Sequence, residues 1–315
     1  MDPVIGRVVA PTRRARRRAR ALGGTTLAAA FLATVAFAAI GGAPPARKDR
    51  SSAQDRVHAN RLARLHAVCS WAPVIGGFDL RSLGDFDLVV VDGVRQRDGS
   101  VDASAKDVRA LHKRGSLVLA YLSVGTVEDW RHYAPHVSDR WKLGQVPSWK
   151  GEQYVDVRSR GWQEMMVREA GGLAAVGFDG LYLDNLDVAE VAPATRRGVI
   201  ALVRKLRAAV PPLLLVGQNG LVVADRIPID AIAHEDVWSR WTDSGYARTP
   251  AEETESRLRK LRRLHARGMP VLTLDYALPG SPAAREALTR SLREGFHPAV
   301  SVLGLDRPPH GVARC

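Results

Sequence analysis

Short apolar runs alternate with longer amphipathic segments from Trp71 to the C-terminal part of the chain. Runs such as DLVVVDG and PVLTLDY are apolar throughout, which is typical of parallel strands that are covered on both faces. The alternation of strand and helix signals predicts parallel strands joined by crossover helices. We expect strands at 72–76, 86–91, 116–122, 152–157, 180–183, 213–216, 231–233, 271–274 and 299–303.

The segments between these runs have the periodicity of helices that pack on a sheet. In one of them Leu258, Leu261 and Leu264 recur at helical spacing opposite a basic face. We expect helices at 103–114, 162–175, 194–209, 251–268 and 281–294.

A single α/β domain of the (β/α)8 barrel type fits this pattern best. The chain has 315 residues, of which 46% are hydrophobic, and such a barrel needs about 250 residues. There are nine candidate strands, whereas the barrel has eight strand positions. We interpret 152–157 as an extension outside the barrel. We place the barrel at 67–315. A doubly wound open sheet is the alternative fold.

The N-terminal arm has a different composition from this body. Residues 1–20 form a basic region with six arginines between Arg13 and Arg20, and residues 21–43 contain the uncharged run LAAAFLATVAFAAI followed by small residues. These features are typical of a secretory signal peptide, and an uncleaved membrane anchor is the alternative. Either one predicts an extracytoplasmic body, secreted or anchored facing outward. We interpret residues 44–66 as a linker with helical potential.

Most of the net charge of +13 belongs to the arm. Residues 1–60 hold eleven Lys and Arg against three Asp and Glu, which leaves +5 for the other 255 residues. A mildly basic body removes the main support for nucleic-acid binding, so we expect no nucleic-acid partner.

The two cysteines, Cys69 and Cys315, lie near the two ends of the predicted barrel. The first and last strands of a barrel are neighbours, and an exported compartment permits a disulfide between them. The alternative is one buried thiol and one terminal thiol. No Cys and His spacing indicates zinc.

Polar residues follow six of the predicted strands, at the end where barrel enzymes carry their catalytic groups. Each one alone has a structural explanation, because Asp and Asn are frequent in turns and at helix N-caps. Their coincidence across strands indicates a site. The strand-end candidates are Asp92, Tyr121, Ser123, Asp184, Asn185, Asp187, Asn219, Glu235, Asp275 and Tyr276, to which we add the nearby Asp129 and the aromatic rings of Trp130 and Trp238.

A carboxylate-rich pocket narrows the class of reaction. The sequence has no G-x-S-x-G, no glycine-rich phosphate loop and no G-x-G-x-x-G after the first strand, so we expect no cofactor. Two carboxylates on different strands suit glycosidic bond hydrolysis, in which one protonates the leaving oxygen and the other attacks the anomeric carbon or activates water. The alternative is a Mg²⁺ or Ca²⁺ site at Asp92, Asp184, Asp187 and Asp275.

Four blocks of the sequence resemble the endo-α-1,4-polygalactosaminidase family, glycoside hydrolase family 114. The likeness covers roughly 71–303, and G-F-D-G-x-x-x-D-N-x-D is its most specific element. The blocks are YLSVGTVEDWR (121–131), YVDVRSRGWQ (154–163), GFDGLYLDNLD (177–187) and IDAIAHEDVW (229–238).

The resemblance implies a (β/α)8 barrel that cleaves α-1,4-linked galactosamine polymers with one Asp and one Glu. The Asp of the D-N-x-D block, on the fourth strand, matches Asp184 as nucleophile, and the Glu after the sixth strand matches Glu235 as acid/base. The chain departs from the family in its first strand, which lacks the aromatic and Gln pair that members often have. It also carries Asp236 directly after Glu235.

A cationic galactosamine polymer would be attracted by a cleft lined with carboxylates, for which Asp92, Asp129, Asp156, Asp187 and Asp275 are candidates. We therefore predict an exported glycosidase that acts on an amino-sugar polysaccharide, with possible membrane anchoring through residues 21–43. The alternatives are a non-catalytic glycan-binding barrel at the cell envelope and a metal-dependent polysaccharide deacetylase or hydrolase.

Overall fold

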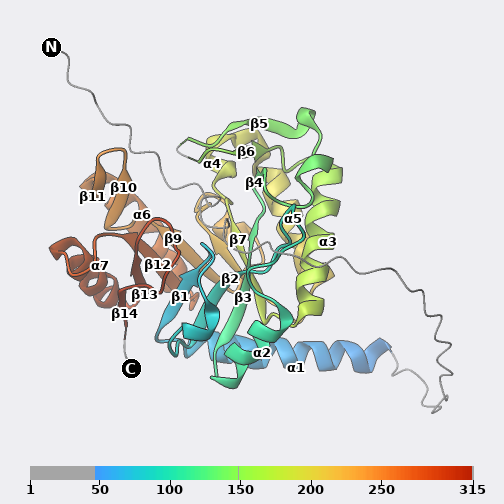
Figure 1. Ribbon diagram of the computed structural model, residues 1–315, viewed down its shortest axis with the longest axis horizontal. Helices are drawn as coiled ribbons and strands as arrows, with labels where there is room; N and C mark the ends of the chain where they lie inside the picture. Colours follow the sequence, from blue (N-terminus) through green and yellow to red (C-terminus); the bar gives the residue numbers. More distant parts are fainter. Residues whose placement is uncertain (1–46, 148, 314–315) are drawn as a thin grey trace, which may run out of the picture.

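The computed structural model describes residues 47–147 and 149–313. Eight parallel strands form its main sheet, in the same order as in the sequence (Figure 1). They are β1 (Trp71–Val74), β2 (Leu88–Asp92), β3 (Leu117–Ser123), β7 (Gly180–Asp184), β8 (Leu214–Gln218), β9 (Ala231–Glu235), β12 (Val271–Tyr276) and β13 (His297–Ser301). The short β14 (Gly311–Val312) adds to β13 in the antiparallel direction.

The sheet curls until its first and last parallel strands lie near each other. The Trp71 indole N–H on β1 donates to the His297 carbonyl on β13 at 2.9 Å. The result is a nearly closed barrel. The prediction of an α/β fold with parallel strands is confirmed, and the doubly wound alternative is wrong, because the strand order of such a sheet reverses at its centre.

Five helices connect the strands, close to the predicted segments. They are α2 (Ala105–Lys113), α3 (Arg160–Val176), α5 (Arg196–Ala209), α6 (Ala251–His265) and α7 (Pro282–Arg293). The β1–β2 and β8–β9 connections contain only the 3-10 turns Leu80–Ser82 and Ala224–Arg226 within the described chain. The remaining short elements are α4 (Val188–Val191) and the 3-10 turns Ala134–His136, Asp139–Trp141 and Pro193–Thr195.

Local sequence signals set the helix ends. At the start of α2, the Asp107 carboxylate accepts the Ser104 backbone N–H at 2.9 Å, as in a capping box. The helix α3 ends at Gly177, whose φ of 106° is a conformation that favours glycine. The helix α7 begins with Ser281 as N-cap and Pro282 in its first turn.

Two small antiparallel sheets extend from the C-terminal ends of the barrel strands (Figure 1). One contains β4 (Thr126–Glu128), β5 (Lys142–Gln145) and β6 (Glu152–Val155), so 152–157 lies outside the barrel as predicted. The other is a hairpin of β10 (Ser239–Thr242) and β11 (Gly245–Arg248), which the sequence pattern did not predict.

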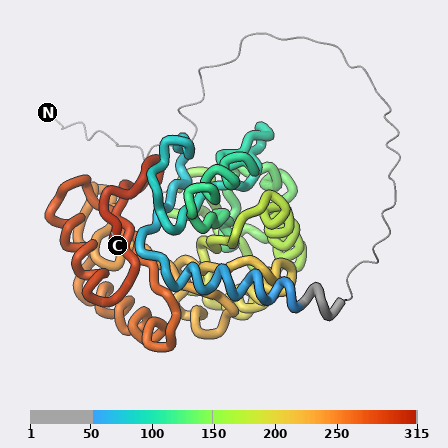
Figure 2. The backbone as a smooth tube through the Cα atoms, turned by 90° about the horizontal axis from the view of Figure 1, so that it is seen from below, coloured from blue at the N-terminus to red at the C-terminus, as the bar shows by residue number. Residues whose placement is uncertain are grey.

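The helix α1 (Arg47–His66) crosses the opposite end of the barrel (Figures 1 and 2). Arg61 donates to Asp179 at 3.1 Å and to the Pro212 carbonyl at 2.8 Å, and Leu65 is buried. The segment expected to be a linker with helical potential, 44–66, thus contains a helix that is ion-paired to the start of β7.

The core has two apolar layers, one inside the barrel and one between the strands and the helices. The inner layer contains the aromatic residues Trp71, Tyr121, Tyr182 and Tyr276 together with Leu, Val and Ala side chains. The outer layer includes Phe178, Trp162 and the leucines of α6 that the periodicity indicated. Strand residues therefore alternate between the two layers, and this alternation decides which strand-end side chains reach the barrel interior.

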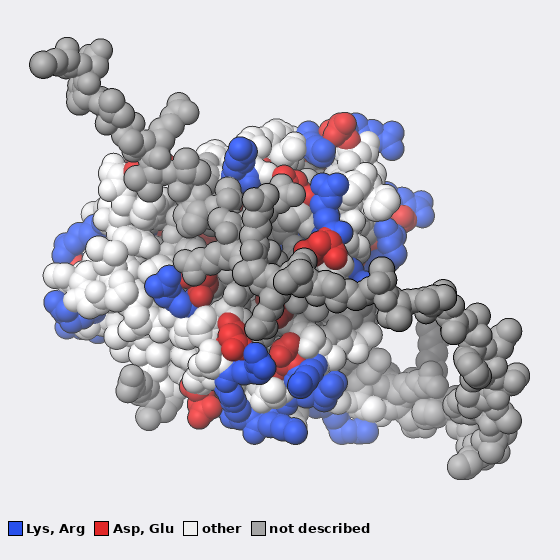
Figure 3. Space-filling view, viewed as in Figure 1, with Lys and Arg blue, Asp and Glu red and all other residues white. Residues whose placement is uncertain are grey.

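Several predictions concern residues outside the described chain. The basic region and the signal or anchor segment lie in 1–46, and Cys315 also lies outside, whereas Cys69 is disulfide-bonded. The pairing of Cys69 with Cys315 stays a prediction. None of the described helices combines the length and apolarity needed to cross a membrane. Figure 3 shows Lys and Arg interspersed with Asp and Glu on one face of the body.

Candidate active site

Two carboxylates end the fourth and the sixth strand of the barrel. Asp184 is the last residue of β7, and Glu235 is the last residue of β9. Both side chains point into the barrel, because Tyr182 and Ala233, each two positions earlier, belong to the inner layer. The pair therefore lies at the C-terminal end of the barrel, on the strands that the resemblance implied.

Three donors surround the Asp184 carboxylate. The Tyr121 hydroxyl on β3 donates to Oδ2 at 2.8 Å, the Asn185 backbone N–H donates to Oδ1 at 2.7 Å, and Asn185 Nδ2 lies 3.2 Å from Oδ2. These bonds fix the orientation of the carboxylate and favour its ionised form.

The amide of Asn185 also connects Asp184 to the neighbouring small sheet. Its Nδ2 lies 2.9 Å from Ser123 Oγ, 3.1 Å from Thr126 Oγ1 and 3.2 Å from Glu152 Oε1. The φ of Asn185 is 61°, which Asn tolerates better than most residues with a side chain. The backbone conformation and the amide contacts together explain Asn at this position.

Two glycines allow the turn after Asp184 to pack closely. A Cβ on Gly125 would lie 1.8 Å from the Asn185 carbonyl oxygen. A Cβ on Gly220, whose φ is 61°, would lie 2.6 Å from Leu186 Cβ. The glycines of Y-L-S-V-G and Q-N-G are therefore required by backbone contact with the D-N-x-D turn.

Glu235 has a similar set of partners. The Tyr276 hydroxyl on β12 donates to Oε1, and Asn219 Nδ2 after β8 donates to Oε2 at 3.2 Å. The backbone N–H of Glu235 donates in return to Asn219 Oδ1 at 3.1 Å. The φ of Asn219 is 59°. Each carboxylate of the pair is thus held by one tyrosine hydroxyl and one asparagine amide.

The two carboxylates influence each other electrostatically. Burial, followed by the charge of Glu235, raises the pKa of Asp184 well above its ordinary value of 3.8, against the opposing effect of the Tyr121 hydrogen bond. Burial also raises the pKa of Tyr276 well above 10, so its hydroxyl stays protonated and donates to Glu235. Two neighbouring carboxylates that repel each other do not ionise independently, so the charge on Glu235 favours the protonated form of Asp184 in the free protein.

A buried cluster of charged side chains, Asp92, Glu128 and Arg131, lies next to the Tyr121 ring. Arg131 Nη1 donates to both oxygens of Asp92 at 2.9 and 2.8 Å, and its Nε donates to Glu128. The guanidinium carbon of Arg131 lies 5.7 Å from the centre of the Tyr121 ring. Asp92, predicted as a substrate contact, thus has its charge matched by Arg131.

Asp187, the last residue of the D-N-x-D block, is buried on one side. Its Oδ1 atom has no hydrogen-bond partner among the described residues. Burial, then the charges of Glu235 and Glu190, raise its pKa to about 6. Burial, then the charge of Asp187, raise the pKa of the Tyr154 phenol on β6, which places Tyr154 close to Asp187.

Four predicted substrate contacts lie elsewhere. Asp275 is on the outward side of β12 and accepts the backbone N–H groups of Trp238 and Ser239 at 2.6 and 2.9 Å. The Trp238 indole is buried and donates to Ser291 of α7 at 2.7 Å. Asp129 is exposed and Trp130 is half-buried, both just after β4. These side chains are not hydrogen-bonded to Asp184 or Glu235 in the described contacts.

The same positions argue against the alternative metal site. Asp92 is bound by Arg131, and Asp275 faces away from the barrel interior. Within 47–147 and 149–313, no three His, Cys, Asp or Glu side chains are grouped so as to hold a metal ion.

Four residues near the pair were absent from the sequence-based set: Arg131, Glu152, Tyr182 and Gln218. Arg131 lies inside the YLSVGTVEDWR block, which is the only signal that pointed to it. Glu152 belongs to a strand that we set aside as an extension, although its carboxylate accepts from Thr126 Oγ1 at 2.6 Å. Tyr182 lies within an apolar run, whereas Gln218 follows one as a polar strand-end residue, and both are directed inward by their position on the strand.

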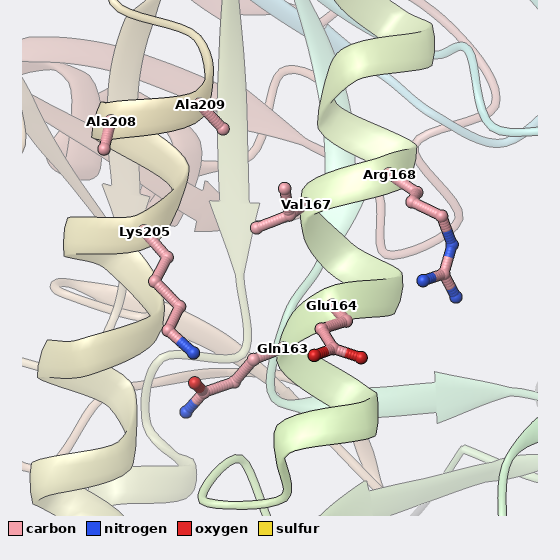
Figure 4. Close-up of a pocket in the computed structure, with 7 residues that line it drawn as sticks. All are labelled: Gln163, Glu164, Val167, Arg168, Lys205, Ala208 and Ala209. Carbon is pink, nitrogen blue, oxygen red and sulfur yellow. The ribbon is translucent and has the colours of Figure 1, made fainter.

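A surface hollow lies between the packed helices α3 and α5 (Figure 4). Its volume is about 540 Å³, and it is lined by Gln163, Glu164, Val167, Arg168, Lys205, Ala208 and Ala209. All seven lie on the outer helices, so this hollow does not include the strand-end carboxylates.

A nearly closed α/β barrel with two carboxylates at the C-terminal ends of its strands is an arrangement that barrel glycosidases use. The comparison with known families agrees with this class. The chain belongs to glycoside-hydrolase family GH114, whose model matches residues 51–310, and it is a glycosidase. The family that the sequence motifs indicated is therefore confirmed.

Relatives with sequence similarity occur in distant organisms. An uncharacterized protein of Deinococcus radiodurans is 29% identical over 294 residues, which cover 84% of this chain and 91% of the relative. An uncharacterized protein of Thermotoga maritima is 27% identical over 221 residues, which cover 64% of this chain and 68% of the relative.

Two solved structures share the fold. The glycoside hydrolase domain of PelA from Pseudomonas aeruginosa is 28% identical and superposes with a TM-score of 0.67, covering 77% of this chain and 98% of that domain. Ega3 from Aspergillus fumigatus, solved in complex with galactosamine, is 15% identical with a TM-score of 0.63, covering 78% of this chain and 95% of Ega3. The second similarity bears on the fold alone.

Proposed function

We propose that the protein hydrolyses α-linked amino-sugar polymers, with Asp184 and Glu235 as its two catalytic carboxylates. The observation that carries this proposal is that Asp184 and Glu235 are held by the same kinds of hydrogen-bond donor. Each carboxylate ends a barrel strand, points inward and receives one tyrosine hydroxyl and one asparagine amide. Two inward carboxylates held in fixed orientations are the groups that glycosidic bond cleavage requires.

We assign the nucleophile role to Asp184 and the acid/base role to Glu235, following the motif resemblance. Burial and the charge of Glu235 raise the pKa of Asp184 in the free protein, so the protonation of one carboxylate depends on the charge of the other. On cleavage, a proton passes from Glu235 to the leaving oxygen while Asp184 supplies negative charge to the anomeric carbon. The three donors around Asp184 favour its carboxylate form once a sugar with developing positive charge lies beside it.

A cationic substrate suits the electrostatics of the surrounding residues. Glu152 and Asp187 contribute further carboxylates beside the pair, since their charges act on Asp184. The nearby positive charge of Arg131 is neutralised by its ion pairs with Asp92 and Glu128. Asp187 Oδ1 is the best placed of these oxygens to accept from a sugar ammonium, because it is buried and has no partner in the described part of the chain. The galactosamine bound by Ega3 has the chemistry that this arrangement would attract.

The direct test is incubation of the purified protein with a panel of α-linked polymers: galactosamine, N-acetylgalactosamine and galactose. We expect new reducing ends only with polymers that carry free amines, with products that differ in mass by one galactosamine unit. The anomeric form of the first product, followed by NMR, distinguishes retention from inversion. Saturable binding without any product would instead support a glycan-binding barrel.

The role of Asp187 has its own test. Because its pKa is about 6, ammonium binding should strengthen as pH rises through 6, so KM should fall between pH 5 and 7. Asp187→Asn should abolish this pH dependence of KM with a smaller effect on kcat. An unchanged KM profile would exclude Asp187 as the ammonium contact.

We also propose that the barrel functions outside the cytoplasm, as the basic region and the apolar run of residues 13–40 suggest. The helix α1 would then be part of the exported body, since Arg61 and Leu65 pack on the barrel. Protease accessibility of the body in intact cells tests this placement.

A further inference from the structure

The inward side chains at the C-terminal end of the barrel follow from the strand register. Tyr182 on β7 pairs with Tyr121 on β3 and with Val216 on β8, and all three belong to the inner layer. Gln218 is two positions beyond Val216, and therefore points inward as well. Ser301 on β13 pairs with the inward Tyr276 and is two positions beyond the inward Ala299.

Three of these inward residues have polar atoms without a partner. Tyr182 Oη, Gln218 Oε1 and Ser301 Oγ have no hydrogen-bond partner in the described structure. The residues are 1%, 3% and 0% exposed, respectively. The other two inward tyrosines, Tyr121 and Tyr276, donate their hydroxyls to the two carboxylates. Two adjacent strands, β7 and β8, and the more distant β13 thus hold unsatisfied polar atoms at the barrel end that carries the satisfied pair.

Unsatisfied buried polar atoms are costly to a fold. Each one lowers the free energy of unfolding relative to a satisfied or apolar alternative. Most buried polar side chains in proteins have a partner, and exceptions concentrate at functional sites. Three exceptions on the inner surface of one barrel end are better explained by a ligand than by packing.

Tyr182 is the residue most closely tied to the catalytic pair. Burial, then the charges of Glu235 and Asp184, raise the pKa of its phenol well above 10, so the hydroxyl stays protonated beside both carboxylates. It is two positions before Asp184 on the same face of β7. The Tyr182 hydroxyl, which can donate through its proton or accept through its oxygen, is therefore held next to the space between Asp184 and Glu235.

We propose that Tyr182 Oη, Gln218 Oε1 and Ser301 Oγ are positioning groups that hydrogen-bond the sugar unit held between Asp184 and Glu235. This inference rests on the proposed function and deepens it. Gln218 Oε1 is an acceptor and takes an N–H or O–H of the sugar, whereas the two hydroxyls donate or accept. The fold thus carries three unsatisfied atoms in the free enzyme that become satisfied when an amino-sugar unit binds.

The test combines stability and kinetics on the full chain. Tyr182→Phe, Gln218→Met and Ser301→Ala each remove an unpartnered atom, so each should melt at the parental temperature or above it. Each should nevertheless lower kcat/KM on the galactosamine polymer at least tenfold, and should reduce the rise in melting temperature that galactosamine oligomers produce in the parent.

Thr273→Val is the matched control. The Thr273 hydroxyl on the outward face of β12 is partnered with Ser291 Oγ at 2.7 Å. Its loss should lower the melting temperature and leave kcat and KM unchanged, the reverse of the result expected for Tyr182→Phe.

The outcomes separate this inference from the proposed function. A parent that cleaves the polymer while all three variants match its kcat and KM overturns the inference alone. A parent that neither cleaves nor binds galactosamine oligomers overturns both. A parent that binds without cleaving leaves the thermal-shift comparison to decide, and an equal shift in parent and variants overturns the inference.

Discussion

The side-chain amide of Asn219 hydrogen-bonds both the side chain and the backbone of Glu235. Its Nδ2 donates to the Glu235 carboxylate at 3.2 Å, and its Oδ1 accepts the Glu235 backbone N–H at 3.1 Å. The two strands β8 and β9 are joined by this side chain at the point where the Glu235 carboxylate leaves the sheet. The φ of 59° at Asn219 is what turns the amide toward Glu235.

We predict that Asn219→Gly and Asn219→Ala lose similar activity but differ in stability. Both remove the amide, and a carboxylate displaced by about 1 Å can cost on the order of 100-fold in kcat. The alanine variant also holds a Cβ at positive φ, so it should be less stable than the glycine variant by about 1–2 kcal/mol. Full activity in Asn219→Gly would show that Glu235 does not depend on this amide.

A second prediction concerns the backbone contact beneath the D-N-x-D turn. Gly125→Ala would drive a Cβ into the Asn185 carbonyl oxygen, so it should lower the free energy of unfolding by about 1–3 kcal/mol and reduce activity by moving Asp184. Gly171→Ala is the control. Gly171 lies in α3 with nothing within 4 Å of the added Cβ, and its replacement should raise stability by about 0.5–1 kcal/mol. Denaturant unfolding and steady-state kinetics measure both.

Breaking the buried ion pairs of Arg131 should lower the free energy of unfolding strongly. Arg131→Met leaves the Asp92 and Glu128 carboxylates buried without their cation, which should lower stability by about 3–5 kcal/mol. Arg131→Lys retains the charge but loses the two-pronged contact, and should fall between the parent and Arg131→Met. Arg160→Met, which breaks an exposed pair with Glu164, should leave the free energy of unfolding at the parental value. Equal effects of Arg131→Met and Arg160→Met would contradict the account.

Asp236 makes stability depend on pH. Burial, then the charges of Glu235 and Asp275, raise its pKa from 3.8 to about 8, although Arg257 and Arg240 act in the opposite direction. The folded state thus keeps a proton that the unfolded state releases, so the stability from this group is present below pH 4 and is lost as pH rises toward 8.

The prediction is that Asp236→Asn stabilises the protein at pH 8 by at least about 1 kcal/mol and has little effect at pH 4. Asn also tolerates the φ of 59° at this position. Asp243→Asn, on the exposed turn of the β10–β11 hairpin, is the control and should shift the melting temperature at neither pH. A gain that is the same at pH 4 and pH 8 would refute the titration of Asp236 as its cause.

The sequence pattern predicted the barrel strands well because their runs are short, apolar and separated by clear helices. It also predicted that 152–157 lies outside the barrel, and so the fourth and sixth strands end at Asp184 and Glu235. No helix was predicted between the first and second barrel strands or between the fifth and sixth, because the intervening segments are short. The structure has only 3-10 turns in these two connections, β1–β2 and β8–β9.

The direction of individual side chains was harder to predict. A strand that is covered on both faces shows no alternation of polar and apolar residues, so nothing in LTLDY distinguishes the outward Asp275 from the inward Tyr276. The Asp92–Arg131 pair joins residues 39 positions apart, and only the folded chain brings them together.

The central claim is that Asp184 and Glu235 together perform hydrolysis. We predict that Asp184→Asn and Glu235→Gln each reduce reducing-end release from an α-1,4-galactosamine polymer by on the order of 1,000-fold or more, while both keep the parental circular dichroism spectrum. With an activated aryl glycoside and azide, Glu235→Gln should form a glycosyl azide of retained anomeric configuration, whereas any azide formed by Asp184→Asn should have the inverted configuration, as their roles require. Parental rates in either variant on the polymer would contradict the account.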